Sequence, residues 1–160
     1  MTVAHIGIGS NLGDSQKIVA AAVDALAGLP HVSALRASAL YATPPWGVVD
    51  QPPFVNAVVE IDTSATAREL LDDLLVIERA AGRVRDGSRW GPRMLDLDLL
   101  LYGDAVLSEP GLDVPHPRIA QRAFVLLPLA DVAPDLDVPG AGRVRELLER
   151  VDAGGCRRLA

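Results

Sequence analysis

Two aspartates interrupt a run of leucines between residues 94 and 102. Alternate residues of a strand point to opposite faces, so Asp96 and Asp98 are predicted to share one face, with Cα atoms about 6.5–7 Å apart. The same alternation assigns four leucines to the other face: Leu95, Leu97, Leu99 and Leu101. Carboxylates at that spacing can bind a divalent cation, which would offset the cost of burying two charges. The pattern predicts a metal site, and a solvated face of an edge strand is the alternative.

The residues just before this strand are rich in arginine. Residues 83–93 contain four arginines and one acid: Arg83, Arg85, Arg89, Arg93 and Asp86. Arginine offers several coplanar donors to phosphate oxygens. A solvated loop is an equal alternative for this segment alone. Next to two metal-binding carboxylates, in a chain of net charge −6, the segment favours a metal–polyphosphate site.

Other residues could complete such a site. His116 lies between two prolines, and a histidine held in this way can donate to a phosphate; an ordinary loop histidine is the alternative. Phe54 and Phe124 are the only phenylalanines, and core packing is the default interpretation for both. The functional alternative is a clamp of two rings around a flat heteroaromatic ligand, with Asn56 bonding to its edge.

Length and composition limit the class of protein. A chain of 160 residues predicts one domain, residues 1–160, and 49% hydrophobic with 22% charged residues is typical of a soluble globular protein. The negative net charge argues against a nucleic-acid or membrane-surface binder. The single cysteine, Cys156, fits a reducing cytoplasm. We expect no signal peptide and no membrane span.

The elements that must position these residues follow from hydrophobic periodicity and breaker residues. Strands are predicted at residues 2–9, 32–42 and 54–61 and from residue 94, with helices at 15–27 and 66–81. A short strand at 105–107, a proline-rich loop at 109–118, a helix at 118–127 that stops at Pro128, a helix at 143–151 and a frayed tail follow. The order predicts an α+β fold with a ferredoxin-like βαββαβ antiparallel sheet, helices on its faces and C-terminal additions.

Seven motifs together resemble the 6-hydroxymethyl-7,8-dihydropterin pyrophosphokinase family of folate biosynthesis. They span residues 3–135 and read GSNLGD, TPPWG, FVNAV, GRVR, RWGPRMLDLDLLLYG, VPHPR and RAFVLLPL. The resemblance implies a ferredoxin-like enzyme that transfers pyrophosphate from ATP to the hydroxymethyl group of the pterin and releases AMP.

The resemblance also implies roles for individual residues. Asp96 and Asp98 would hold two Mg²⁺ ions, and Arg83 and Arg93 would join them as catalytic residues. ATP would be bound by Glu78, Arg85, Arg89, Trp90, Arg93, His116 and Arg122. The pterin would be bound by Thr43, Pro44, Trp46, Phe54, Asn56, Asp96 and Phe124. Arg85 and Trp90 would lie on a mobile loop that closes over the reactants.

We therefore expect a cytoplasmic, monomeric, Mg²⁺-dependent enzyme whose partners are ATP and 6-hydroxymethyl-7,8-dihydropterin, with no nucleic acid and no membrane. One alternative is another Mg²⁺-dependent phosphotransferase or nucleotide hydrolase, which would release ADP or phosphate. An alternative of another class is a non-catalytic ferredoxin-like ligand-binding module. An RNA-binding module of this kind would need exposed aromatic residues on its central strands.

Overall fold

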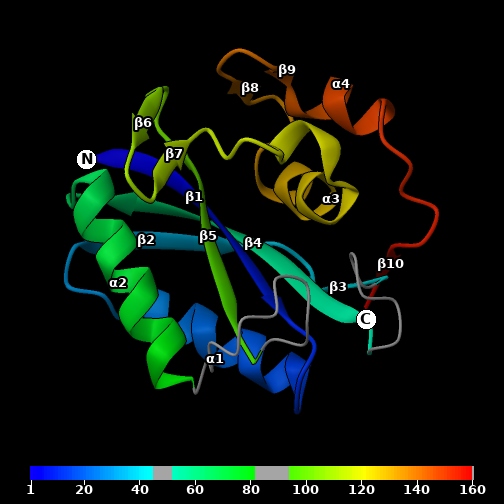
Figure 1. Ribbon diagram of the computed structural model, residues 1–160, viewed down its shortest axis with the longest axis horizontal. Helices are drawn as coiled ribbons and strands as arrows, with labels where there is room; N and C mark the ends of the chain where they lie inside the picture. Colours follow the sequence, from blue (N-terminus) through cyan, green and yellow to red (C-terminus); the bar gives the residue numbers. More distant parts are fainter. Residues whose placement is uncertain (45–51, 82–93, 160) are drawn as a thin grey trace.

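The computed structural model describes residues 1–44, 52–81 and 94–159 of an α+β protein built on one antiparallel sheet (Figure 1). The main sheet contains β1 (Thr2–Ser10), β2 (Val32–Ala37), β3 (Tyr41–Thr43), β4 (Phe54–Thr63), β5 (Asp96–Tyr102) and β10 (Arg157–Arg158). The strand order is β10-β3-β4-β1-β5, and β2 also pairs with β4. The strand that carries the two aspartates therefore lies at one end of this order, next to β1.

Four helices cover the two faces of the sheet: α1 (Ser15–Ala27), α2 (Ala67–Ala80), α3 (Ala123–Val132) and α4 (Val144–Glu149). Figure 1 shows α1 and α2 on one side of the sheet and α3 with α4 on the other. The predicted capping box of α2 is confirmed, because the Thr66 hydroxyl accepts from Glu69 N and the Glu69 carboxylate accepts from Thr66 N. None of the helices in the described ranges is long and apolar enough to cross a membrane.

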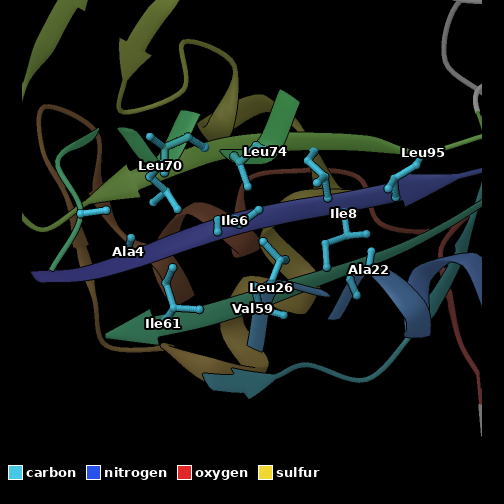
Figure 2. Close-up of a cluster of buried hydrophobic side chains, with 14 of the residues drawn as sticks. Ala4, Ile6, Ile8, Ala22, Leu26, Val59, Ile61, Leu70, Leu74 and Leu95 are labelled. Atoms are coloured by element: carbon cyan, nitrogen blue, oxygen red, sulfur yellow. The ribbon is translucent and has the colours of Figure 1, made fainter. Parts of the chain in front are cut away.

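Two apolar clusters lie on opposite faces of β1 and β4. On one face, Ala4, Ile6 and Ile8 of β1 pack with residues of α1 and α2 such as Leu26 and Leu70 (Figure 2). The other cluster joins β4 and β5 to α3 and α4 and contains Val58, Leu100, Leu126, Leu129 and Leu147. Because strand residues alternate, His5, Gly7 and Gly9 of β1 point toward the second face.

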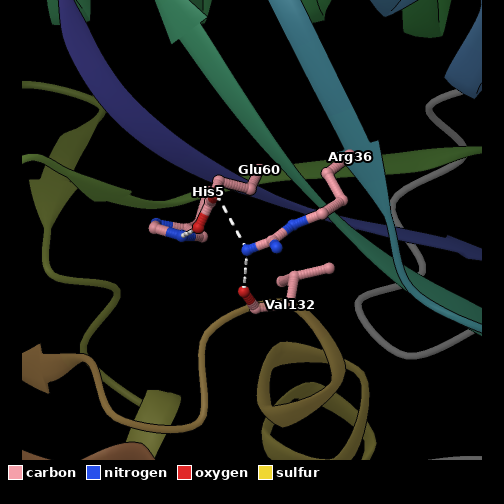
Figure 3. Close-up of polar contacts among 4 residues, drawn as sticks. All are labelled: His5, Arg36, Glu60 and Val132. Carbon is pink, nitrogen blue, oxygen red and sulfur yellow. Dashed lines mark hydrogen bonds and ion pairs between the residues drawn. The ribbon is translucent and has the colours of Figure 1, made fainter.

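A polar network fixes α3 to this second face. His5 Nε2 and Glu60 Oε2 lie 2.9 Å apart, and Arg36 Nη2 lies 3.2 Å from Glu60 Oε1 (Figure 3). The same Arg36 nitrogen donates to the carbonyl oxygen of Val132, the last residue of α3. Burial lowers the pKa of His5, and the hydrogen bond to Glu60 acts in the opposite direction. The network ties β1, β2 and β4 to the C-terminal end of α3, so it helps to set the position of that helix.

The predicted strand at 32–42 is interrupted. β2 ends at Ala37 and β3 begins at Tyr41, and both pair with β4. At the break, Ser38 N donates to Val58 O and Ser38 Oγ accepts from Val58 N, each at 2.9 Å. A side-chain oxygen thus replaces a backbone partner, so the chain leaves the ladder without an unpaired N–H group on β4.

The prediction that a helix would stop at Pro128 is wrong. Residues Ile119–Gln121 form one turn of 3₁₀ helix, and α3 then continues through Pro128 to Val132. A proline inside a helix costs about 3 kcal/mol through a lost hydrogen bond and a steric clash. Burial of the apolar residues around it, including Leu126 and Leu129, offsets that cost.

The rest of the C-terminal half also differs from the expectation. The predicted strand at 105–107 is instead β6 (Leu107–Glu109), and part of the expected loop pairs with it as β7 (Leu112–Val114). A second small pair follows, β8 (Asp137–Val138) with β9 (Gly142–Arg143). The last helix is shorter than residues 143–151, and the tail is not frayed, because β10 pairs with β3. Tight turns and backbone hydrogen bonds between short strands order these segments, although their sequences lack a long hydrophobic periodicity.

Candidate active site

Asp96 and Asp98 share one face of β5, as predicted. Leu97 belongs to the first apolar cluster, so the half-buried aspartates on either side of it point to the opposite face. In the β1–β5 pairing, Asp98 lies opposite Gly7 and Asp96 lies opposite Gly9. Neither glycine has a side chain, so neighbouring side chains approach the backbone closely there: a Cβ atom on Gly7 would lie 3.5 Å from the Leu100 side chain, and one on Gly9 would lie 2.9 Å from Asn56 Oδ1.

The alternation of β5 breaks just after the second aspartate. Ile6 pairs with Leu99 and His5 with Leu101, so Leu100 is an extra, bulged residue. Leu101 therefore joins the second apolar cluster and does not share the face of Leu97, which corrects the prediction for that leucine. The carbonyl oxygen of Leu100 accepts from the backbone N–H of His116 at 2.9 Å. The end of β5 thus fixes the loop that carries the candidate phosphate-binding histidine.

His116 has a defined tautomer and charge. Its Nδ1 accepts from the backbone N–H of Arg118 at 3.1 Å, so Nε2 carries the proton in the neutral ring. Burial, reinforced by the positive charges of Arg122 and Arg118, lowers the pKa of His116 to about 4. The side chain is therefore neutral near pH 7 and presents one N–H donor, suited to a phosphate oxygen.

Arg122 lies within electrostatic reach of the aspartate pair. Burial lowers the pKa of this guanidinium, and the charges of Asp98 and Asp96 act in the opposite direction. Its Cζ atom lies 5.3 Å from the centroid of the Phe124 ring, which orients the planar group. Its Nε atom is buried without a hydrogen-bond partner among the described residues. The Arg122 charge thus lies near the carboxylates, which makes this residue a candidate for binding a phosphate held there.

A second group of polar residues lies across β1 from the aspartates. Asn56 pairs with Gly9 in the β1–β4 ladder, so Asp96 and Asn56 flank the same glycine. Asn56 is 7% exposed, and its Nδ2 donates to Thr43 Oγ1 of β3 at 2.5 Å. A Cβ atom on Gly9 would lie 2.9 Å from Asn56 Oδ1 and 3.8 Å from the ring of Phe54. The Asn56 amide and the Phe54 ring therefore lie next to Gly9. Together with Thr43 they form a polar and aromatic group of residues, called the pterin half-site below.

Glu78 of α2 supports β5 from the opposite face. Its carboxylate is 2% exposed and accepts from the backbone N–H of Leu97, the residue between the two aspartates, at 2.8 Å. This bond fixes the segment from which both aspartates project. The expected contact of Glu78 with the nucleotide stays a prediction.

A pocket of about 240 Å³ opens beside β5. Its walls come from α2, β5, β7 and the histidine loop: Leu71, Leu97, Asp98, Leu99, Gly111, Leu112, Asp113, His116 and Pro117. The pocket is apolar toward Leu71 and Leu112 and polar toward Asp98 and His116. This mixture suits a nucleoside whose phosphates extend toward the aspartates.

Several predicted site residues lie outside the described residues: Trp46, Arg83, Arg85, Arg89, Trp90 and Arg93. Pro44 is described and exposed. Phe54 on β4 and Phe124 on the first turn of α3 are both half-buried, and α3 packs against β4. The two-ring clamp stays a prediction.

Two features of the site were missed from the sequence. Glycines at alternate positions of β1, Gly7 and Gly9, are a readable signal, since a glycine inside a strand often marks close approach of another group, here the side chains of Leu100 and Asn56. The bulge at Leu100 has no comparable signal, because a run of three leucines fits an uninterrupted strand equally well.

Comparison with known proteins decides the family. Residues 5–134 match the profile of the 7,8-dihydro-6-hydroxymethylpterin-pyrophosphokinase (HPPK) family. The chain belongs to the HPPK family. It is 49% identical over 159 residues to 2-amino-4-hydroxy-6-hydroxymethyldihydropteridine pyrophosphokinase of Methylorubrum extorquens, covering 99% of both chains. It is 47% identical over 155 residues to the enzyme of the same name from Pseudomonas aeruginosa, covering 97% of this chain and 95% of the other.

Solved structures show that this HPPK chain shares its fold with distant proteins. A chain of Plasmodium falciparum HPPK-DHPS matches with a TM-score of 0.74 over 93% of this chain, at 15% sequence identity. The match spans 44% of that longer chain. At this identity the likeness concerns the fold alone.

Proposed function

We propose that this protein transfers pyrophosphate from ATP to the hydroxymethyl oxygen of 6-hydroxymethyl-7,8-dihydropterin and releases AMP, as a step of folate biosynthesis. One observation carries the assignment. The carboxylates proposed to bind the metal and the Asn56 amide lie on either side of β1, because Asp96, Gly9 and Asn56 are consecutive neighbours across the sheet. Two strand spacings separate the outer two, roughly 9–10 Å between backbones, so the two substrates would bind on either side of Gly9.

In this proposal ATP binds on the side of the site that carries His116 and Arg122. The neutral His116 offers Nε2–H and Arg122 offers a buried guanidinium, so both can bind phosphate oxygens without a proton transfer. The pocket beside Asp98 accommodates the nucleoside. Arg83, Arg85, Arg89, Trp90 and Arg93 complete the ATP site from the preceding loop in this proposal, with Arg83 and Arg93 acting on the transferred group.

Two Mg²⁺ ions bound by Asp96 and Asp98 belong to the proposal. The donor set fits this ion, because both residues offer carboxylate oxygens on one face of β5. Within the described ranges no group of three or more His, Cys, Asp or Glu residues could hold a metal. Two carboxylates with substrate phosphates and water as remaining ligands are typical of Mg²⁺ in phosphoryl-transfer enzymes. When bound, the ions neutralise the phosphate charge that develops during transfer.

In this proposal the pterin binds on the side of the site that carries Asn56 and Thr43. Asn56 is held by Thr43 and presents its amide over Gly9, where it can bond to the edge of a flat ring. Phe54 and Phe124 supply stacking surfaces, and Pro44 and Trp46 border the slot in the proposal. The protein's contribution to the rate is then to align the hydroxyl with the β-phosphorus and to exclude water.

The finer assignments of fold and context are also part of the proposal. The antiparallel order of β1, β4 and β5, with α1 and α2 as connections on one face, supports the ferredoxin-like βαββαβ arrangement. We further propose a single domain at 1–160 and a monomer. A cytoplasmic location is supported by the single cysteine.

One incubation tests the function. The protein is mixed with ATP, Mg²⁺ and 6-hydroxymethyl-7,8-dihydropterin, and the nucleotides are separated by chromatography. We expect AMP in equal amount to the pyrophosphorylated pterin, and none without the pterin. ADP or free phosphate would instead identify another phosphotransferase or a hydrolase. Binding of both ligands with no product would identify a ligand-binding module.

A further inference from the structure

The C-terminal segment, residues 155–158, packs next to the pterin half-site. A Cβ atom on Gly155 would lie 2.9 Å from Cγ and 3.3 Å from Cδ of Pro44, the residue that follows β3. Carbon atoms in ordinary contact lie about 3.5–4.0 Å apart, so only a glycine fits against this ring. The segment reaches Pro44 although the two positions are 111 residues apart in the sequence.

Backbone pairing places the glycine there. Gly155 lies in a turn that is closed by Cys156 N, which donates to Ala153 O at 3.0 Å. Arg157 then pairs with Ala42, and Arg158 with Tyr41. Beyond the pair, Leu159 N donates to Leu40 O at 2.8 Å. β10 therefore covers the edge of β3 that faces away from β4.

The strand β3 has only three residues and depends on its neighbours for its position. β4 holds one edge and β10 the other. Tyr41 OH donates to the carboxylate of Asp131 on α3, at 3.0 and 2.9 Å from its two oxygens. Thr43, the last residue of β3, accepts the hydrogen bond that orients Asn56. A displacement of Pro44 is thus passed through Thr43 to the amide over Gly9.

We propose that residues 155–158 are a positioning element for the pterin half-site and that Gly155 acts through its contact with Pro44. The inference rests on the proposed function. The ring of Pro44 is part of its backbone, so a side chain at position 155 cannot be accommodated by a rotamer change and moves the chain at Thr43. β3 and β5 are separated by β4 and β1, about 14 Å at three strand spacings, so the ATP side is spared.

Adjacent glycines provide a matched test. Gly155→Ala and Gly155→Val are compared with Gly154→Ala and Gly154→Val, because a Cβ on Gly154 meets only the movable carboxylate of Asp152, at 3.1 Å. AMP formation gives kcat and the KM values for pterin and ATP, and thermal unfolding checks the fold. We expect Gly155→Ala to raise the KM for pterin about three- to tenfold, and Gly155→Val more, with kcat and the KM for ATP within about twofold of wild type. The Gly154 variants should match wild type.

Three results would overturn the inference: an unchanged KM for pterin in the Gly155 variants, an equal rise in the Gly154 variants, or an equal rise in the KM for ATP. If Gly155→Val does not fold, Gly155→Ala decides. Faster amide exchange at 41–43 in the Gly155 variants, and not in the Gly154 variants, is the independent structural readout. If wild type releases no AMP, the proposed function fails and the inference fails with it. If wild type is active and the Gly155 variants are kinetically identical to it, only the inference fails.

Discussion

The backbone N–H of His116 donates to the carbonyl oxygen of Leu100, the bulged residue two positions after Asp98. This hydrogen bond joins the loop that carries His116, the proposed phosphate-binding residue, to the strand that carries the carboxylates. In the proposed function, the His116 ring and the two carboxylates would then need little rearrangement when ATP binds. Groups that are fixed in place in this way stabilise the charge on a transferring phosphoryl group most effectively.

Replacement of Asp98 by asparagine should leave the fold intact and remove nearly all turnover. The amide keeps the size of the side chain, but it lacks the charge that binds a cation. We expect kcat/KM to fall by at least about a hundredfold, or about 2.7 kcal/mol of transition-state stabilisation. Steady-state AMP formation measures the loss, and the exposed Asp72→Asn on α2 is the control. An Asp98→Asn enzyme with wild-type kinetics would remove Asp98 from the metal site.

His116 should stay neutral across the working pH range. Its pKa of about 4 predicts that the ring proton resonances do not titrate between pH 5.5 and 8. His116→Ala should lower kcat/KM about tenfold, the equivalent of about 1.4 kcal/mol for one lost donor to a charged oxygen. NMR titration and kinetics check the two statements separately. A midpoint near 6.5 would show that the ring is not held neutral in the fold.

The lowered histidine pKa also makes a prediction for stability. The unfolded chain binds a proton at His116 near pH 6.5, whereas the folded chain does so only near pH 4. The contribution of neutral His116 to the free energy of unfolding is therefore fully present above pH 6.5 and is lost as the pH falls toward 4. The direction is the same for the buried His5. From pH 7.5 to 5, urea denaturation should show a loss of about 1 kcal/mol from His116 after discounting for its partial exposure. The slope should be shallower in His116→Gln, and an equal slope in both proteins would contradict the assignment.

A methyl group on Gly9 should act mainly on the acceptor. In Gly9→Ala the new Cβ would lie 2.9 Å from Asn56 Oδ1, so the amide must move away from the slot. We expect the KM for pterin to rise about tenfold or more, because misplacement of one positioning group by a fraction of an ångström weakens alignment. Gly28→Ala is the matched control, since its Cβ would have only ordinary contacts of 3.5 Å or more. Equal kinetics for the two variants would show that the amide over Gly9 does not bind the acceptor.

Apart from the break at Ser38 and the bulge at Leu100, the N-terminal two-thirds of the described fold could be predicted, because local and tertiary signals agree there. β1 alternates, α2 begins with a capping box, and Leu97 separates two aspartates that share a face. The same periodicities decide which side chains are buried, so the secondary structure predicted from the pattern agrees with the packing in the structure.

The remaining errors arise where tertiary contacts override the local pattern. Pro128 remains inside α3 because its apolar neighbours are buried on several sides. Ser38 ends β2 by a hydrogen bond to a residue on another strand. β10 exists only because the edge of β3 is available to it. Val58 is far from Ser38 in the sequence, and β3 is far from β10, so the local sequence around Ser38 or β10 does not reveal these contacts.

The alternation of leucine and aspartate in β5 has a consequence for folding. A slip of β5 by one residue against β1 would turn Asp96 and Asp98 into the apolar cluster and expose the leucines between and beside them. Each buried carboxylate would cost several kcal/mol, so misregistered pairings are strongly disfavoured. The residues proposed to bind the metal therefore also select the correct strand register while the chain folds, before any substrate is bound.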